Sequence, residues 1–206
     1  MTERVPCKEC GATILPSTAT ATGGVCMACK QGIRAALEQS KAFHAEQRKP
    51  NPERDYWTAL IHRIHHTAEG YEGLSQVEKY YFLCCVLNGE VNNGGLHQFY
   101  SNSSGERYAE TLEALEELDA WHSRRILARS CELLFPGCSA PPRDNELRFE
   151  VLPWGPDEDD PSATPAAWVL ELDGLDKEYW KDPDDLYTRL TAYGVANNLF
   201  APKPME

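Results

Sequence analysis

Four cysteines near the start of the chain have a spacing that can bind a metal ion. Cys7, Cys10, Cys26 and Cys29 follow the pattern Cys-x2-Cys-x15-Cys-x2-Cys, which is typical of a four-thiolate zinc site. Each Cys-x2-Cys pair can place two sulfurs on one ion, and four thiolates complete the closed tetrahedron that Zn²⁺ accepts. Because protein ligands fill every coordination position, the pattern predicts a structural zinc ion and not a catalytic one.

The same cysteines could instead form two disulfides or a redox-active dithiol. The chain shows no apolar signal segment, so we expect a cytoplasmic location, where reducing conditions favour metal-bound thiolates over disulfides. Among the remaining cysteines, which lack ligand spacing, Cys84 and Cys85 lie in an apolar run and are expected to be core residues.

Rows of acidic residues form a second pattern. Four glutamates recur at helical spacing, namely Glu106, Glu110, Glu113 and Glu117. On a helix they would form a solvent-facing stripe, called here the acidic stripe, that spans about 16 Å at ~1.5 Å per residue. Four further acids are consecutive, namely Asp157, Glu158, Asp159 and Asp160, and a third group lies within 182–185. Such rows can imitate the phosphates of duplex DNA, although an ordinary solvated helix face would show the same spacing.

The distribution of charge divides the chain into two parts. The net charge is −12, with +3 in residues 1–50 and −15 in residues 51–206. The second part would repel nucleic acid and attract a basic protein, such as a DNA-binding transcription factor or a nuclease. No apolar run approaches the ~20 residues that span a membrane, so we expect no membrane partner. Composition leaves open whether the protein forms a homodimer.

A polar block at residues 90–105 offers a candidate pocket. Its candidate pocket residues are Glu90, Asn93, His97, Gln98 and Asn102. Glu90 and His97 could act as acid and base, but no nucleophile motif, phosphate loop or second carboxylate accompanies them at a matching spacing. The favoured alternative is a structural turn, in which Asn93-Gly94-Gly95 joins two helices and Gly94 takes a positive φ.

Two histidines form a weaker metal-binding pattern. His62 and His66 are four residues apart, a separation that can hold a metal on one face of a helix. A zinc-protease motif has Glu after its first histidine, and Arg63 stands there instead. We therefore expect these histidines to face solvent or a partner.

Hydrophobic periodicity predicts a mainly α fold, with a compact multi-helix domain preceded by a small zinc ribbon or knuckle. Expected helices cover residues 32–48, 52–64, 75–88, 105–118, 121–135, 173–181 and 183–199. Ser75 and Glu78 form a capping box, and Leu147 to Leu152 could form one short strand in a proline-rich connection. The expected organisation is a four-cysteine zinc module (1–32), a helical linker (33–51) and an acidic helical domain (52–206).

The polar block also resembles the signature of the DNA-mimic protein 19 family, catalogued as domain of unknown function 4375. The shared pattern is an acidic residue, Asn-Gly-Gly, then Gln, two aromatics and Asn-Ser-x-Gly, and Leu96 stands where an aromatic is frequent. The likeness extends from about Trp57 to Phe200 and includes Leu175-Asp176-Lys177-Glu178-Tyr179-Trp180. The cysteine segment looks like a zinc-binding leader found on some bacterial relatives.

The resemblance implies a non-enzymatic interaction protein, a DNA mimic that binds and regulates a basic DNA-binding protein. The acidic stripe and the run from Asp157 to Asp160 are then the expected partner-binding residues, and the acidic domain itself would not bind DNA. An immunity protein that neutralises a basic toxin is the alternative. An enzyme that uses the pocket of Glu90 and His97 is a third hypothesis.

Overall fold

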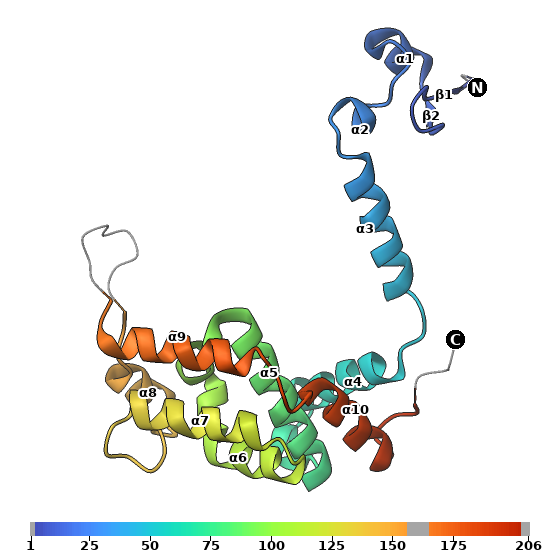
Figure 1. The fold of residues 1–206 in the computed structure, drawn as a ribbon. Coiled ribbons are helices and arrows are strands. Elements are labelled where there is room, and N and C mark those ends of the chain that lie inside the picture. The colour runs from blue at the N-terminus through green and yellow to red at the C-terminus, as the bar shows by residue number, and fades with distance from the viewer. Residues whose placement is uncertain (1–2, 156–164, 203–206) are drawn as a thin grey trace. The chain divides into compact units, whose positions relative to one another are not determined.

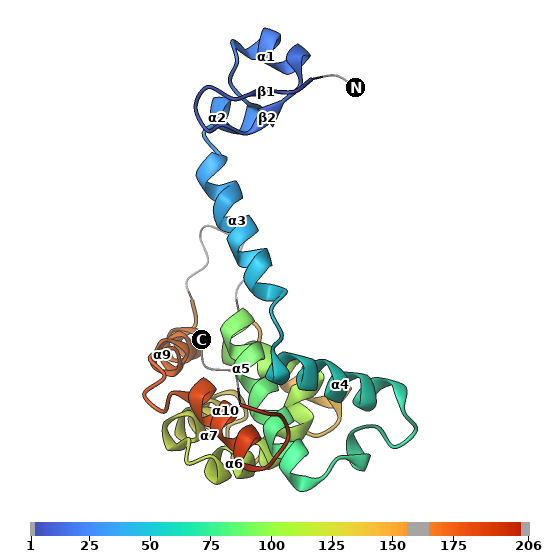
Figure 2. The same cartoon turned by 90° about the vertical axis from the view of Figure 1, so that its right-hand side faces the viewer.

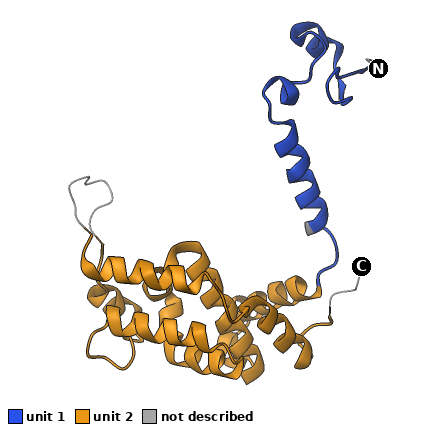
Figure 3. Ribbon diagram, in the orientation of Figure 1, with its two compact units in different colours: residues 1–51 blue, residues 52–206 orange. Residues whose placement is uncertain are grey.

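The computed structural model describes residues 3–155 and 165–202. The chain divides into two compact units, Met1–Asn51 and Pro52–Glu206 (Figure 3). The expected fold class, a mainly helical domain preceded by a small cysteine-containing module, is confirmed. The acidic run from Asp157 to Asp160 lies outside the described residues.

The first unit combines a short hairpin with three helices. Strand β1 (Val5–Pro6) pairs antiparallel with β2 (Thr13–Ile14). The helices that follow are α1 (Pro16–Thr22), α2 (Met27–Lys30) and α3 (Arg34–Gln47). Gly23 ends α1 with a φ of 70°, a left-handed conformation that glycine adopts without steric cost. The chain thereby turns toward the second pair of cysteines.

The second unit is a bundle of helices around α5. In chain order its elements are α4 (Pro52–His66), the 3-10 helix η1 (Gly70–Gly73), α5 (Gln76–Ser101), the 3-10 helix η2 (Ser103–Arg107), α6 (Tyr108–Glu117), α7 (Trp121–Leu134), α8 (Asn145–Val151), α9 (Ala167–Tyr179) and α10 (Leu186–Ala196). Helix α5 packs against α6, α8, α9 and α10, and α7 packs against α6 and α9 (Figures 1 and 2).

Apolar residues from most of these helices form one core. Among those almost completely buried are Leu60, Leu87, Leu115, Leu127 and Leu190. Cys84 is also fully buried, as its apolar neighbours predict. No helix in the described residues has the length and the apolar character needed to cross a membrane.

The predicted start of α5 is confirmed, but its predicted end is wrong. The Ser75 hydroxyl accepts a hydrogen bond from the Glu78 backbone N–H at 3.3 Å, and the Glu78 carboxylate accepts one from the Ser75 N–H at 2.9 Å. The helix does not stop near residue 88. It resumes after a kink at Gly94 and Gly95 and continues to Ser101.

The expected strand at Leu147 to Leu152 is wrong, because residues 147–151 belong to α8 and Leu152 directly follows it. The Asp144 side chain caps this helix by accepting a hydrogen bond from the Leu147 N–H at 2.8 Å. Within this helix Phe149 is about half exposed, whereas Arg148 is fully buried. Helix α9 also differs, since it begins at Ala167 and not near residue 173.

The expected helix over residues 105–118 is divided between two elements. Its first turn is the 3-10 helix η2, and the regular helix α6 begins at Tyr108. Glu106 therefore precedes the helix that carries the other three glutamates of the acidic stripe.

Candidate functional site

The four N-terminal cysteines converge on one point. The Sγ atoms of Cys7, Cys10, Cys26 and Cys29 all lie within 4.8 Å of one another. The Sγ atoms of Cys10 and Cys26 are 3.8 Å apart, close to the edge of ~3.8 Å that a tetrahedron with Zn–S bonds of ~2.3 Å requires. The four sulfurs therefore fit a single metal ion with four thiolate ligands.

Hydrogen bonds to sulfur support the cluster electrostatically. The Cys26 backbone N–H donates to Cys7 Sγ at 3.2 Å, and the Arg34 guanidinium donates to Cys26 Sγ at 2.9 Å. A hydrogen bond from the Cys29 N–H and the nearby Arg34 lower the pKa of Cys26 to about 6. Burial raises the pKa of Cys29 to about 12, so Cys26 and Cys29 do not ionise alike. Sequence reasoning missed Arg34, which follows the last cysteine by five positions on α3.

Side chains at residues 176 and 180 form hydrogen bonds to the main chain at the kink in α5. Gly95 has φ 76° and ψ −179°, so the helical hydrogen bonds of its neighbours are broken. The Asp176 carboxylate accepts a hydrogen bond from the Leu96 N–H at 2.7 Å, and the Trp180 indole donates to the Val91 carbonyl at 3.2 Å. Asp176 of α9 and Trp180, the residue that follows its end, thus bond to two main-chain groups that would otherwise be costly to bury.

Close packing explains why glycine stands at the kink. A Cβ on Gly95 would lie 2.5 Å from Asp176 Oδ2. Gly94 has a φ of −153°, so our expectation of a positive φ there is wrong and applies to Gly95 instead. A Cβ on Gly94 would overlap the side chain of Gln98. Burial raises the pKa of the Asp176 carboxyl, against the lowering effect of the Leu96 N–H.

Four of the five candidate pocket residues form one network around Glu90. Its carboxylate accepts hydrogen bonds from Gln98 Nε2 at 2.6 Å, Asn102 Nδ2 at 2.8 Å and Ser104 Oγ at 2.8 Å. Asn93 joins the network by donating to Gln98 Oε1 at 3.1 Å. Since Glu90 precedes the kink and its donors follow it, the network holds the two parts of α5 at a fixed angle.

The fifth candidate, His97, has different surroundings. Its Nε2 lies 2.9 Å from the Pro153 carbonyl oxygen. The centroid of its ring lies 5.0 Å from that of the Trp154 ring and 6.2 Å from that of the Trp168 ring. Glu90 and His97 are thus engaged with separate sets of partners. The structure does not bring them together as an acid–base pair.

A buried arginine donates hydrogen bonds to carbonyls at the C-terminal end of α5. Arg148 is fully buried and donates hydrogen bonds to the carbonyls of Tyr100, Asn102 and Pro142, each at 2.8 Å. Burial lowers the pKa of this guanidinium, while the partial negative charge of helix-terminal carbonyls favours the cation. A Cβ on Gly105 would lie 2.7 Å from Arg148 Nε, which explains the glycine that ends the polar block.

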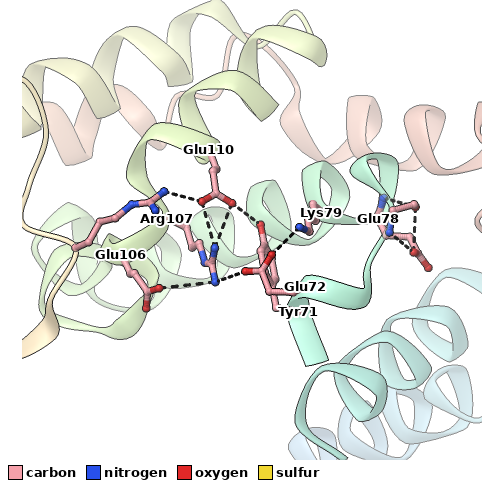
Figure 4. A network of polar contacts seen from close by, with 9 residues as sticks. Tyr71, Glu72, Glu78, Lys79, Glu106, Arg107 and Glu110 are labelled. Carbon is pink, nitrogen blue, oxygen red and sulfur yellow. Dashed lines mark hydrogen bonds and ion pairs between the residues drawn. The ribbon is translucent and has the colours of Figure 1, made fainter. Parts of the chain in front are cut away.

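The acidic stripe is partly neutralised within the chain (Figure 4). The Glu110 carboxylate accepts hydrogen bonds from Tyr71 Oη at 2.9 Å, Arg107 at 3.2 Å and Arg143 at 2.9 Å. Its side chain is 26% exposed, so the expectation that Glu110 faces solvent is wrong. Sequence spacing placed it on the stripe but gave no sign of the cations that other segments supply.

Arg107 is the centre of this network. Its guanidinium lies 3.0 Å from the Glu72 carboxylate, 3.7 Å from that of Glu106, and 4.1 Å from the centroid of the Tyr71 ring. Burial alone would lower the pKa of Arg107, but Glu110 and Glu72 outweigh it and raise that pKa. Glu106 and Glu110 therefore both share the positive charge of one arginine.

The other two glutamates of the acidic stripe are not neutralised by cations among the described residues. Glu113 and Glu117 are exposed on α6, and neither forms an ion pair in the described part of the chain. The neighbouring Glu116 pairs with Arg124 at 3.3 Å.

The acidic group at 182–185 has structural roles. The Asp184 carboxylate accepts a hydrogen bond from the Ser123 N–H at 2.8 Å at the start of α7. Asp182 accepts one from the Leu186 N–H at 3.0 Å at the start of α10. Acidic residues at helix N-termini are stabilising, so Asp182 and Asp184 contribute to the capping of α10 and α7.

The two histidines of α4 lie side by side. The ring centroids of His62 and His66 are 4.8 Å apart, and both residues are exposed. Among the described residues, the one group of three or more potential ligands that could hold a metal is the cysteine cluster.

Comparison with known proteins identifies one related family. A family model described as DMP19-like protein matches residues 72–198. The match contains the kink, the Glu90 network, Arg148 and Asp176. The search of curated proteins and the search of solved structures each found no match.

Proposed function

Because the chain belongs to the DMP19-like family, we propose that its helical unit is a non-enzymatic acidic domain that occupies the DNA-contacting surface of a basic protein. The net charge of −15 over residues 51–206 supports this proposal. A basic groove evolved for phosphates would attract such a domain, and the attraction would weaken as salt is added.

The observation that carries the proposal is the pair of uncompensated carboxylates on α6. Glu113 and Glu117 are exposed and lie about 6 Å apart along the helix axis, at ~1.5 Å per residue. Alternate phosphates of one DNA strand are ~7 Å apart along the duplex axis. These two glutamates, and not the whole acidic stripe, are the proposed mimic of phosphate charge.

The Glu90 network supports the non-enzymatic part of the proposal. The carboxylate of Glu90 receives three hydrogen bonds that fix its position, and His97 is bonded elsewhere. These contacts hold the kink of α5, and so the polar block at residues 90–105 has a structural explanation.

We further propose that the cysteine cluster holds one structural Zn²⁺. Four cysteine ligands in this spacing suit the tetrahedral coordination of zinc. Because the first unit contains few buried residues, metal binding would contribute much of its folding free energy.

An affinity capture tests the proposed function. The full-length protein is immobilised, incubated with a lysate of its native cells, and washed with duplex DNA. We expect at least one captured protein to be released by duplex DNA and to bind that DNA in a mobility-shift assay. If every captured protein resists displacement by DNA, the protein is not a DNA mimic.

A further inference from the structure

A pocket of about 330 Å³ opens between α4, α5 and α6. Its walls are mostly apolar, with Ile61 and Ile64 from α4 and Phe82 and Val86 from the first part of α5. The acidic residues Glu90 and Glu106 also line it. A volume near the lower end of the range for small-molecule sites suits one long side chain better than a larger ligand.

Glu90 has capacity for one more hydrogen bond. Its Oε2 accepts from Gln98 and Asn102, whereas Ser104 is the one donor to Oε1 within the part of the chain that the structure describes. A carboxylate oxygen has two lone pairs, so Oε1 can accept a second donor. All three donors are neutral, so the charge of Glu90 has no cationic partner among the described residues.

One cation of the chain is already held at the wall of this pocket. Arg107, which also lines the pocket, stacks over the ring of Tyr71 at 4.1 Å. Its charge is balanced by Glu72 and Glu110, at 3.0 and 3.2 Å. The positive charge of Arg107 therefore does not compensate Glu90.

We propose that this pocket takes the side chain of a lysine or arginine from the basic partner. The inference rests on the proposed function and adds a specific contact to it. The alkyl stem of the incoming residue packs against Ile61, Ile64 and Phe82, as long basic side chains do on apolar surfaces. Its cationic head donates a charge-assisted hydrogen bond to Glu90 Oε1.

Such an anchor provides selectivity that exposed carboxylates lack. Glu113 and Glu117 would attract many basic surfaces, because long-range attraction depends mainly on charge. A pocket accepts a side chain at one position and in one orientation, and buried anchors of this kind dominate the energy of many interfaces.

The test is an NMR titration of the full-length protein, observed at the methyl groups of Ile61 and Ile64. The probes are N-acetyl-arginine amide and N-acetyl-lysine amide. Each has a neutral counterpart of similar shape, N-acetyl-citrulline amide for arginine and N-acetyl-norleucine amide for lysine, used at matched ionic strength. We expect saturable shifts with at least one cationic probe and about tenfold weaker binding of its neutral counterpart, the loss expected for a hydrogen bond to a charged group.

Two variants locate the binding, and a third serves as a control. Val86→Phe fills the pocket and leaves Glu90 in place, while Glu90→Gln removes the charge. Both should abolish the selective shifts. Glu150→Gln removes an exposed carboxylate on α8 and should leave them unchanged. Near-ultraviolet circular dichroism confirms that each variant is folded, and the comparison of probes with the parent protein does not depend on any variant.

Equal affinity for charged and neutral probes would overturn the inference, and so would cationic shifts that persist in folded Val86→Phe. An absence of saturable shifts at Ile61 and Ile64 would overturn it as well. The titration needs no partner protein, so its result is independent of the affinity capture. A failed titration with successful displacement by DNA would overturn the pocket alone, and the reverse result would overturn the proposed function alone.

Discussion

The carboxylate of Asp176 accepts a hydrogen bond of 2.7 Å from the backbone N–H of Leu96, which lies 80 residues earlier in the chain. This contact joins the two segments on which the family resemblance depends. One segment breaks α5 at Gly95, and the other supplies Asp176 and Trp180 to the main-chain groups that the break exposes. The two motifs therefore contact each other and together stabilise the kink of α5 within the helical unit.

Removal of the Asp176 carboxylate should destabilise the helical unit. Asp176→Ala leaves the buried Leu96 N–H without a partner, at a cost of about 1–3 kcal/mol. Asp176→Asn keeps an acceptor oxygen and should cost less. Urea unfolding measures both, with Asp173→Ala on the exposed face of α9 as the control. A free energy of unfolding that Asp176→Ala leaves unchanged would show that water satisfies Leu96 equally well.

The two glycines of the kink should differ in their tolerance of alanine. Gly95→Ala forces a side chain into a positive φ and against Asp176, which should cost on the order of 1–3 kcal/mol. Gly94→Ala requires a shift of the flexible Gln98 side chain and should cost less. Thermal unfolding of both variants tests the order. The reverse order would mean that the Glu90 network, and not the backbone conformation, limits substitution.

Local signals in the sequence predicted much of the helical fold. The capping box of Ser75 and Glu78 is a short-range pattern whose partners lie three residues apart, and it is present. The cysteine spacing likewise brought four ligands together, because tight turns determine the geometry within each pair.

The remaining errors arose where partners are distant in sequence. Arg148 stabilises the end of α5 from 48 residues away, and nothing in its own segment indicates a buried cation. The pairing of Glu110 with Tyr71 and Arg143 depends on how three segments pack. Helical spacing could place Glu110 on a stripe, but only the tertiary structure shows which carboxylates are paired with a cation.

Glu78 should make the stability of the helical unit dependent on pH. Burial opposes its ionisation, but hydrogen bonds from Arg63 and Ser75 outweigh burial and lower the pKa of this carboxyl. Between the folded and unfolded pKa values the unfolded state binds more protons, so stability falls as pH drops below ~4.3 toward the folded pKa.

The variant Glu78→Gln isolates that contribution. The difference in unfolding free energy between parent and variant should be greatest above about pH 5 and should shrink as pH falls toward 3. Glu150→Gln, at an exposed site, should show no such trend. A difference that is constant over this range would mean that the charge of Glu78 is not linked to folding.

The metal site should be structural and confined to the first unit. Elemental analysis is expected to find one zinc per chain. Cys26→Ser should remove the metal and unfold residues 1–30 while the helical unit melts normally. Cys138→Ser, at an exposed cysteine outside the cluster, is the control and should retain the metal. A chain without zinc, or a mapped disulfide between Cys7 and Cys10, would contradict the metal site.

Charge reversal on α6 tests the central claim most directly. The measurement is competition between this protein and duplex DNA for the captured basic protein, at several salt concentrations. The test variant is Glu113→Lys with Glu117→Lys. The matched control is Glu146→Lys with Glu150→Lys, which reverses two exposed glutamates with the same spacing on α8. We predict that the parent displaces DNA, that salt weakens displacement, and that the α6 variant needs about tenfold more protein while the control needs little more. Equal losses from both variants, or no displacement by the parent, would contradict the account.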